Sequence, residues 1–178
     1  MKSGNEQGFT LAEILTVVAV IGSIAVIAVP LLSFMDSKRL DVAAGEVGNA
    51  LRFAIGEAGR TGSYVLADAQ TTPGHLRVVR SDASGADLGA ISDPLTKRAL
   101  DIDVSASAFS AQVAMEPRFL QGGTAYAQLL IGPATQLRVL DGAIDRGPLQ
   151  AGSGIVLSID SSSVTVAIDE ATGRVTLP

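Results

Sequence analysis

The stretch that decides the fold of this chain is Gly8-Phe9-Thr10-Leu11-Ala12-Glu13, which opens an apolar run from Ile14 to Val29. It places one carboxylate, that of Glu13, at the start of a segment that is otherwise apolar enough for a membrane. A carboxylate near the end of a membrane-spanning helix costs a few kcal/mol, so an acidic residue there indicates a function. The partner that we expect for it is an amine.

Three other kinds of segment share some features of this stretch. A secretory signal has a basic start and a short apolar core, whereas this run extends to Val29 and beyond. A plain signal anchor explains the length, because Phe9 to Val29 as a helix spans about 30 Å, but it does not explain Glu13. The many β-branched residues favour a buried strand, but the run is far too long for one.

The stretch resembles the class III signal of type IV prepilins and type II secretion pseudopilins. That signal has a short polar leader, Gly, Phe, a few apolar residues, Glu and then an unbroken apolar helix. The resemblance implies that residues 1–8 are a leader, which a membrane prepilin peptidase removes by cutting between Gly8 and Phe9. The same enzyme would methylate the new Phe9 amine.

By the same resemblance, Glu13 is the assembly glutamate of the family. At helical spacing Glu13 lies about one turn from Phe9, so its carboxylate could meet the Phe9 amine of a neighbouring subunit. In apolar surroundings such a pair is strong and either half alone is penalised. This pairing would favour subunits docked in one axial register.

The helix is expected to have two halves, a membrane and assembly half over residues 9–34 and an amphipathic half over residues 35–62. Pro30 lies where the helix would leave the bilayer, and proline bends a helix without necessarily ending it; that Pro30 ends this one is the open alternative. Apolar residues recur at three- and four-residue spacing from Leu40 to Ala58, which predicts that the helix resumes, with Gly62 as its stop. Four glycines in this half either weaken it or allow close packing; they are Gly45, Gly48, Gly56 and Gly59.

Beyond Gly62 the period becomes strand-like, which predicts a β-rich globular domain over residues 63–178. The expected strands are Tyr64–Ala67, Leu76–Arg80, Ala99–Val104, Phe109–Met115, Leu137–Leu140, Ile155–Ile159, Val164–Ile168 and Val175–Leu177. The last three should form an antiparallel meander with turns at residues 160–163 and 169–173, while residues 81–94 and 142–154 are expected to be loops. The predicted fold class is α+β and pilin-like, with a long N-terminal helix followed by an antiparallel sheet domain.

Residues 51–62, 164–168 and 172–175 are similar to the helix end and final hairpin of the H-type minor pseudopilins and related minor pilins. The resemblance implies a non-enzymatic minor pseudopilin of a type II secretion system, single-pass in the bacterial inner membrane, with a cytoplasmic N-terminus and a periplasmic domain. Its implied partners are the prepilin peptidase, other pseudopilins or pilins, the assembly platform with its ATPase, and membrane lipid. The alternatives are a minor pilin that primes type IV pili and, further off, a DNA-binding minor pilin.

Composition limits the other function classes. A net charge of −5 argues against a nucleic-acid surface, and the absence of cysteine rules out a disulfide, unlike in many major pilins. A zinc site would have only His75 and carboxylates to draw on, so no metal or other cofactor is expected, although calcium bound by scattered carboxylates stays open. No catalytic residue is nominated, since a lone His75 is more often solvated or hydrogen-bonded, and Asp101 and Asp103 fit one face of a half-exposed strand.

Overall fold

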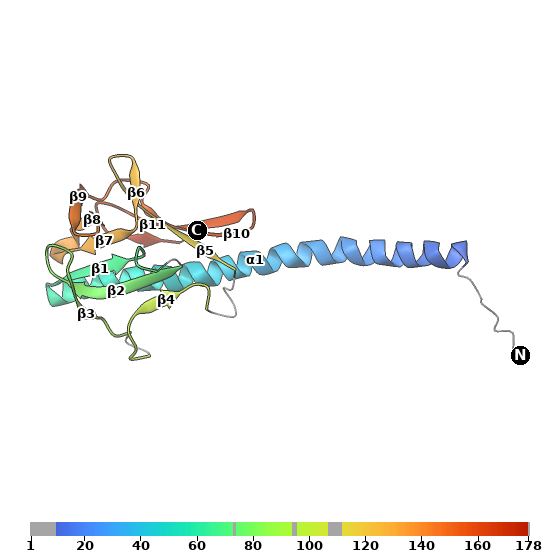
Figure 1. Cartoon of the computed structure of the whole chain (residues 1–178), viewed down its shortest axis with the longest axis horizontal. Helices are drawn as coiled ribbons and strands as arrows, with labels where there is room; N and C mark the ends of the chain where they lie inside the picture. Colours follow the sequence, from blue (N-terminus) through green and yellow to red (C-terminus); the bar gives the residue numbers. More distant parts are fainter. Residues whose placement is uncertain (1–9, 73, 94–95, 107–111, 178) are drawn as a thin grey trace, which may run out of the picture. The chain divides into compact units, whose positions relative to one another are not determined.

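The computed structural model describes residues 10–72, 74–93, 96–106 and 112–177, without the side chains of residues 24–34. The chain divides into two compact units, Met1–Ser37 and Lys38–Pro178. In the described residues, one long α-helix is followed by twelve strands and a short 3-10 helix, and the strands pair antiparallel. Figure 1 shows the long helix and the strands that follow it. The α+β class with an N-terminal helix and antiparallel sheets is therefore confirmed.

Helix α1 runs from Leu11 to Thr61 and passes through Pro30 without ending. The alternative that Pro30 terminates the helix is therefore wrong, while a bend at Pro30 stays a prediction. The helix stops as predicted before Gly62, which has a φ of +65° and donates its N–H to the carbonyl oxygen of Ala58 at 3.0 Å. Glycine takes this left-handed conformation at low cost, which is why it commonly ends helices.

The second half of α1 is amphipathic and buries one stripe against the β domain. Its buried side chains recur every three or four residues and none is more than 3% exposed; they are Leu40, Ala43, Ala44, Val47, Ala50, Leu51, Ala54 and Ala58. Five of these eight residues are alanine, so the helix can approach the strands closely. The expected amphipathic half is confirmed for the residues from Leu40 onward.

Seven strands form the larger sheet, in the order β3-β2-β1-β7-β8-β9 with β4 also paired to β2. Its strands are β1 (Tyr64–Asp68), β2 (His75–Ser81), β3 (Asp87–Ala90), β4 (Asp101–Asp103), β7 (Gln128–Ile131), β8 (Leu137–Asp141) and β9 (Ile144–Pro148). One edge of β2 pairs with β1 from residue 77 to residue 81, and the other edge is divided between β4 and β3. This division places β4 beside the start of β2.

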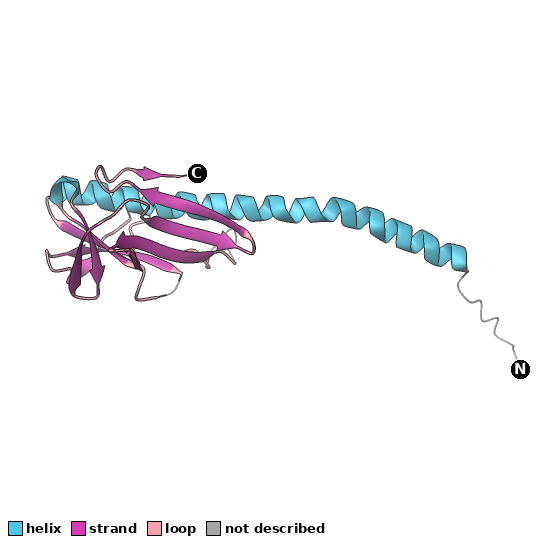
Figure 2. Ribbon diagram, turned by 90° about the horizontal axis from the view of Figure 1, so that it is seen from above, coloured by secondary structure: helices cyan, strands magenta, loops and turns pink. Residues whose placement is uncertain are grey.

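Five strands form the second sheet, in the order β12-β11-β10-β5-β6. Figure 2 shows the strands of the domain in magenta. They are β5 (Ala114–Gln121), β6 (Thr124–Tyr126), β10 (Gly154–Ile159), β11 (Ser162–Ile168) and β12 (Val175–Thr176). Strands β10, β11 and β12 are successive antiparallel neighbours, so the predicted meander is confirmed. Strand β12 also contacts the helix, because Arg52 donates a hydrogen bond to the carbonyl oxygen of Val175 at 3.1 Å and Leu177 packs over Gly48.

Several predicted strands and loops are wrong. Residues 109–111 lie outside the described residues, and the strand expected there instead starts at Ala114 and continues to Gln121. The expected loops contain β3 and β9, two exposed edge strands that show no apolar alternation because neither face is well buried. Strand β7 was missed for the opposite reason, since all four of its residues are buried and a short, doubly buried strand has no alternation either.

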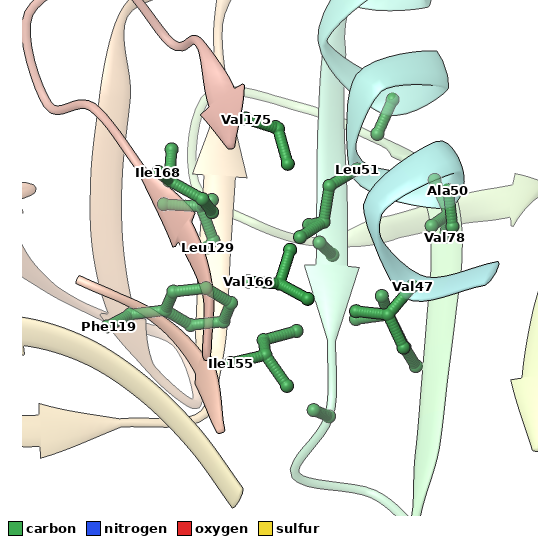
Figure 3. Close-up of a cluster of buried hydrophobic side chains, with 14 of the residues drawn as sticks. Val47, Ala50, Leu51, Val78, Phe119, Leu129, Ile155, Val166, Ile168 and Val175 are labelled. Atoms are coloured by element: carbon green, nitrogen blue, oxygen red, sulfur yellow. The ribbon is translucent and has the colours of Figure 1, made fainter. Parts of the chain in front are cut away.

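The main core gathers side chains from α1 and from both sheets (Figure 3). Val47 and Leu51 of the helix, Leu129 of the larger sheet, and Phe119 and Ile155 of the smaller one are all fully buried. A second, smaller cluster contains Leu66, Val79, Leu130 and Leu140 of the larger sheet. Residues 65 and 67 belong to the main core and residue 66 to the second cluster, which explains why the central strand β1 is buried on both faces.

Candidate functional site

Glu13 lies in the first turn of α1, three residues after Thr10, the residue that caps the helix. The backbone N–H of Glu13 donates to the Thr10 hydroxyl at 3.3 Å and to the Thr10 carbonyl oxygen at 3.0 Å. Thr10-Leu11-Ala12-Glu13 has the spacing of a capping box, in which a Glu three residues after the cap also favours the positive helix end. The sequence carried this signal and we had not used it, so Glu13 has a local role beside any role in assembly.

The helix surface around Glu13 is apolar and uncovered within this chain. Seven large apolar side chains between residues 11 and 21 are between 53% and 81% exposed; they are Leu11, Ile14, Leu15, Val17, Val18, Val20 and Ile21. Continuous apolar exposure of this kind marks a surface that lipid or another protein covers.

The uncharged polar side chains of this stretch are bonded within the helix. The hydroxyls of Thr16 and Ser23 donate to the carbonyl oxygens of Ala12 and Ala19, both at 2.8 Å. Such bonds lower the cost of placing a hydroxyl in apolar surroundings. Within residues 11–23, the charge of Glu13 is then the feature that costs free energy in apolar surroundings.

The structure describes little of three further predicted features of the N-terminal segment. Gly8 and Phe9, the predicted cleavage and methylation residues, lie outside the described residues. Pro30 belongs to α1 by its backbone, and its side chain is not described. A search restricted to the described residues finds no helix with the length and apolar character that crossing a membrane requires.

A second candidate site is a cavity of about 720 Å³ on the unit Lys38–Pro178, which we call the acidic groove. Helix α1 contributes Glu46, Asn49, Ala50 and Phe53, while Asp93, Leu100, Asp101, Ile102, Asp103 and Ala106 come from strand β4 and the residues around it. The floor is apolar and the rim carries four carboxylates. Sequence reasoning had not brought these residues together, because they meet through tertiary packing.

His75 lies between the two aspartates of β4. Its Nδ1 is 3.1 Å from Asp101 Oδ1, and its Nε2 is 3.3 Å from Asp103 Oδ2. The pairing of β2 with β4 produces this arrangement, because His75 is opposite Asp103 and Arg77 is opposite Asp101. The expectation that His75 is a hydrogen-bonded residue is confirmed.

The geometry around His75 does not resemble a metal site. The two ring nitrogens face different carboxylates, so the three side chains do not converge on one point. Both contacts are hydrogen bonds only when the ring is protonated, since a neutral imidazole donates from one nitrogen. In the described part of the chain, no group of three or more metal-ligating side chains is found.

Asp103 keeps its negative charge at neutral pH. The Ser105 hydroxyl donates to Asp103 Oδ1 at 2.6 Å, which is the main reason that the pKa of Asp103 lies below its ordinary value. The Ser105 backbone N–H and the nearby His75 act in the same direction. Asp103 therefore contributes a negative charge to the rim of the acidic groove.

Three arginines on the larger sheet are paired with neighbouring aspartates. Arg77 pairs with Asp87, and Arg138 Nε donates to Asp145 Oδ2 at 2.7 Å. Arg146 donates a hydrogen bond to Asp141 Oδ2 at 2.5 Å, and this bond raises the pKa of Arg146. These pairs offset positive charge that a phosphate backbone would need.

Comparison with known proteins gives a fold-level similarity. No protein-family model matches the chain, and no curated protein matches it. A crystal structure of the type IV minor pilin FimU from Pseudomonas aeruginosa strain PAO1 is 15% identical, with a TM-score of 0.47, over 82% of this chain and 92% of that one. A second crystal form of FimU is 14% identical, with a TM-score of 0.44, over 78% of this chain and 92% of that one.

Proposed function

We propose that this chain is a non-enzymatic structural subunit of a pilin-like filament, and specifically a minor pseudopilin of a type II secretion system. The observation that carries the proposal is the carboxylate of Glu13 in the first turn of an exposed apolar helix. This helix begins shortly after the Gly8-Phe9 pair in the sequence. A helix of this kind needs a cover and its charge needs a partner. A neighbouring subunit of the same kind supplies both.

In this proposal a prepilin peptidase removes residues 1–8 and methylates the new Phe9 amine. Residues 9–34 are held in the inner membrane, with the β domain in the periplasm. This membrane placement rests on the apolar run to Val29, which includes residues whose side chains the structure does not describe. Lipid covers the exposed apolar side chains before assembly, and neighbouring helices cover them afterwards.

Glu13 then fixes how subunits dock. Its carboxylate pairs with the Phe9 amine of the next subunit, and a misdocked subunit leaves both charges in apolar surroundings, which is costly. The platform protein and ATPase drive the addition of subunits, and the completed filament helps export folded proteins.

The cleavage site can be tested by replacing Gly8 with leucine. We expect the Gly8→Leu protein to keep its leader and to stay out of the filament. The measurement is the N-terminal sequence of the membrane-extracted protein by mass spectrometry. A mature Phe9 N-terminus in this variant would refute the processing site.

The register argument can be tested with Glu13→Gln. Glutamine also suits the third position of a capping box, so this variant keeps the helix start and removes only the charge. We expect normal cleavage and membrane insertion with strongly reduced incorporation into the filament, whereas the exposed turn variant Glu170→Gln should incorporate normally. Unchanged incorporation of Glu13→Gln would leave the capping role as the only role of Glu13.

A deletion strain separates secretion from pilus assembly. Quantitative proteomics of the culture medium and of the sheared surface fraction should show exported proteins lost and surface pili kept. The opposite result would make the chain a minor pilin that primes type IV pili. Complementation with the intact gene is the control for both fractions.

A further inference from the structure

The acidic groove is lined by apolar side chains from both the helix and the β domain. Ala50 and Phe53 of α1 form one wall, and Leu100 and Ile102 form the other. Val42, Glu46, Asn49 and Phe53 follow one another at helical spacing, and Val42 is 41% exposed, so apolar surface continues along the helix beyond the groove. A volume of about 720 Å³ is within the range of sites that hold a small ligand or a few side chains.

The negative charge on the rim favours a ligand that carries a positive charge. Glu46, Asp101 and Asp103 lie on the rim, and the last two are only partly exposed, at 43% and 28% of their side chains. A carboxylate accepts about four hydrogen bonds, so contact with His75 Nδ1 leaves Asp101 with capacity for another donor. Asp103 already accepts from the Ser105 N–H, the Ser105 hydroxyl and the Ala106 N–H, so it attracts a cation mainly through its charge. An apolar floor beneath several carboxylates suits a side chain that is apolar along its length and cationic nearby.

We propose that the acidic groove binds a segment of another protein in which an aromatic or aliphatic side chain is adjacent to an arginine or lysine. The apolar side chain packs on Phe53 and Ile102, and the cation pairs with Asp101 and Asp103. The net charge of −5 on this chain, with Arg77, Arg138 and Arg146 already paired, disfavours a second copy as the source of that segment. The inference goes beyond the proposed filament role and does not depend on Glu13.

The probe is the dipeptide N-acetyl-Phe-Arg-amide, with N-acetyl-Phe-Glu-amide as the matched control. Both are titrated into the full chain in detergent solution, and binding is followed by two-dimensional NMR shifts of the backbone amides. We expect the arginine dipeptide to bind about fivefold tighter, in keeping with a pair of partly exposed charges, and to shift residues near the groove. The preference should shrink at high salt.

Two variants identify the groove as the site. Asp101→Asn with Asp103→Asn should reduce the preference for arginine to less than about twofold, since both side chains keep their shape but lose their charge. Glu170→Gln, in an exposed turn, should keep the full preference, and the NMR spectra report directly that each variant is folded.

Three results would overturn the proposal. The first is equal affinity for the two dipeptides or no binding of either, and the second is a preference that survives in the double aspartate variant. The third comes from a photo-crosslinking amino acid at Asn49, which lines the groove. Linkage there to a second copy of the chain, or to residues 107–111 of the same chain, would show that another occupant fills the groove.

Discussion

Replacing Gly154 with alanine should destabilise the domain, because there is no room for one added methyl group. Gly154 starts β10 and pairs with Ala167 of β11 and Arg118 of β5. A Cβ atom there would lie 2.3 Å from the carbonyl oxygen of Val166 and 3.0 Å from the Cα atom of Ala167. Both obstacles are backbone atoms, so no side-chain rotation can relieve the overlap.

The expected magnitude follows from that distance. Carbon and oxygen atoms in neighbouring strands normally approach to about 3.3 Å, so β11 would have to move by about 1 Å. Added methylenes in packed cores cost about 1–3 kcal/mol and occasionally more, and a backbone obstacle places Gly154→Ala near the upper end. For a chain of 178 residues, a loss of about 3 kcal/mol lowers the Tm by about 6–12 °C.

The assay is thermal and urea unfolding of the full chain in detergent, followed by far-UV circular dichroism. Gly45→Ala is the matched control, because an added Cβ atom there has no atom within 4 Å and alanine favours a helix interior by up to about 1 kcal/mol. The same methyl group should therefore stabilise the helix and destabilise the sheet. A Gly154→Ala protein that melts at the wild-type temperature would refute the close approach of β10 and β11.

Three further predictions concern the core, a buried hydroxyl and the pH dependence of stability. Phe119→Ala should lower the urea-derived free energy of unfolding by about 3–5 kcal/mol, since Phe119 is fully buried in the main core; a loss below about 1 kcal/mol would contradict that packing. Ser153→Ala should cost about 1–3 kcal/mol in the same assay, because the Ser153 hydroxyl accepts from the Leu120 N–H at 2.9 Å and donates to the Gln150 carbonyl oxygen at 2.6 Å. Asp169 has a pKa below its ordinary value of 3.8, mainly through the Thr172 hydroxyl, so its contribution to stability is present above that value and is lost as the pH falls through the lower pKa of the folded state. Asp169→Asn keeps the hydrogen-bond acceptor but should show a smaller loss of stability on acidification below pH 3.8, and an unchanged acid limb would count against this account.

The helix and the final meander could be predicted from the sequence because their signals are local. The three- and four-residue spacing after Leu40 matches the buried stripe, and Gly62 stops the helix where a left-handed residue is needed. The turn after Asp169 is also local, since the carboxylate of Asp169 accepts from the Thr172 backbone N–H at 2.7 Å. Each of these features depends on residues only a few positions apart.

The remaining strands and the groove could not be predicted because they depend on distant partners. Strand β7 is buried on both faces because Leu129 and Ile131 pack in the main core and Leu130 packs in the second cluster. Strand β9 is an exposed edge with no apolar pattern of its own. His75 lies near Asp101 and Asp103 through the register of β2 against β4, across a separation of 26 residues for the contact with Asp101. The capping role of Glu13, by contrast, was visible in the four residues from Thr10.

The contact between β12 and α1 sets a time limit on folding during synthesis. Arg52 and Val175 are 123 residues apart, so the helix must wait for that length of chain before the bond between them can form. At about 5–20 residues per second, translation takes about 6–25 s to cover this distance. During that interval the buried stripe from Leu40 to Ala58 has no β12 to pack against. A chaperone that protects this apolar stripe on the nascent chain must therefore bind during the same interval.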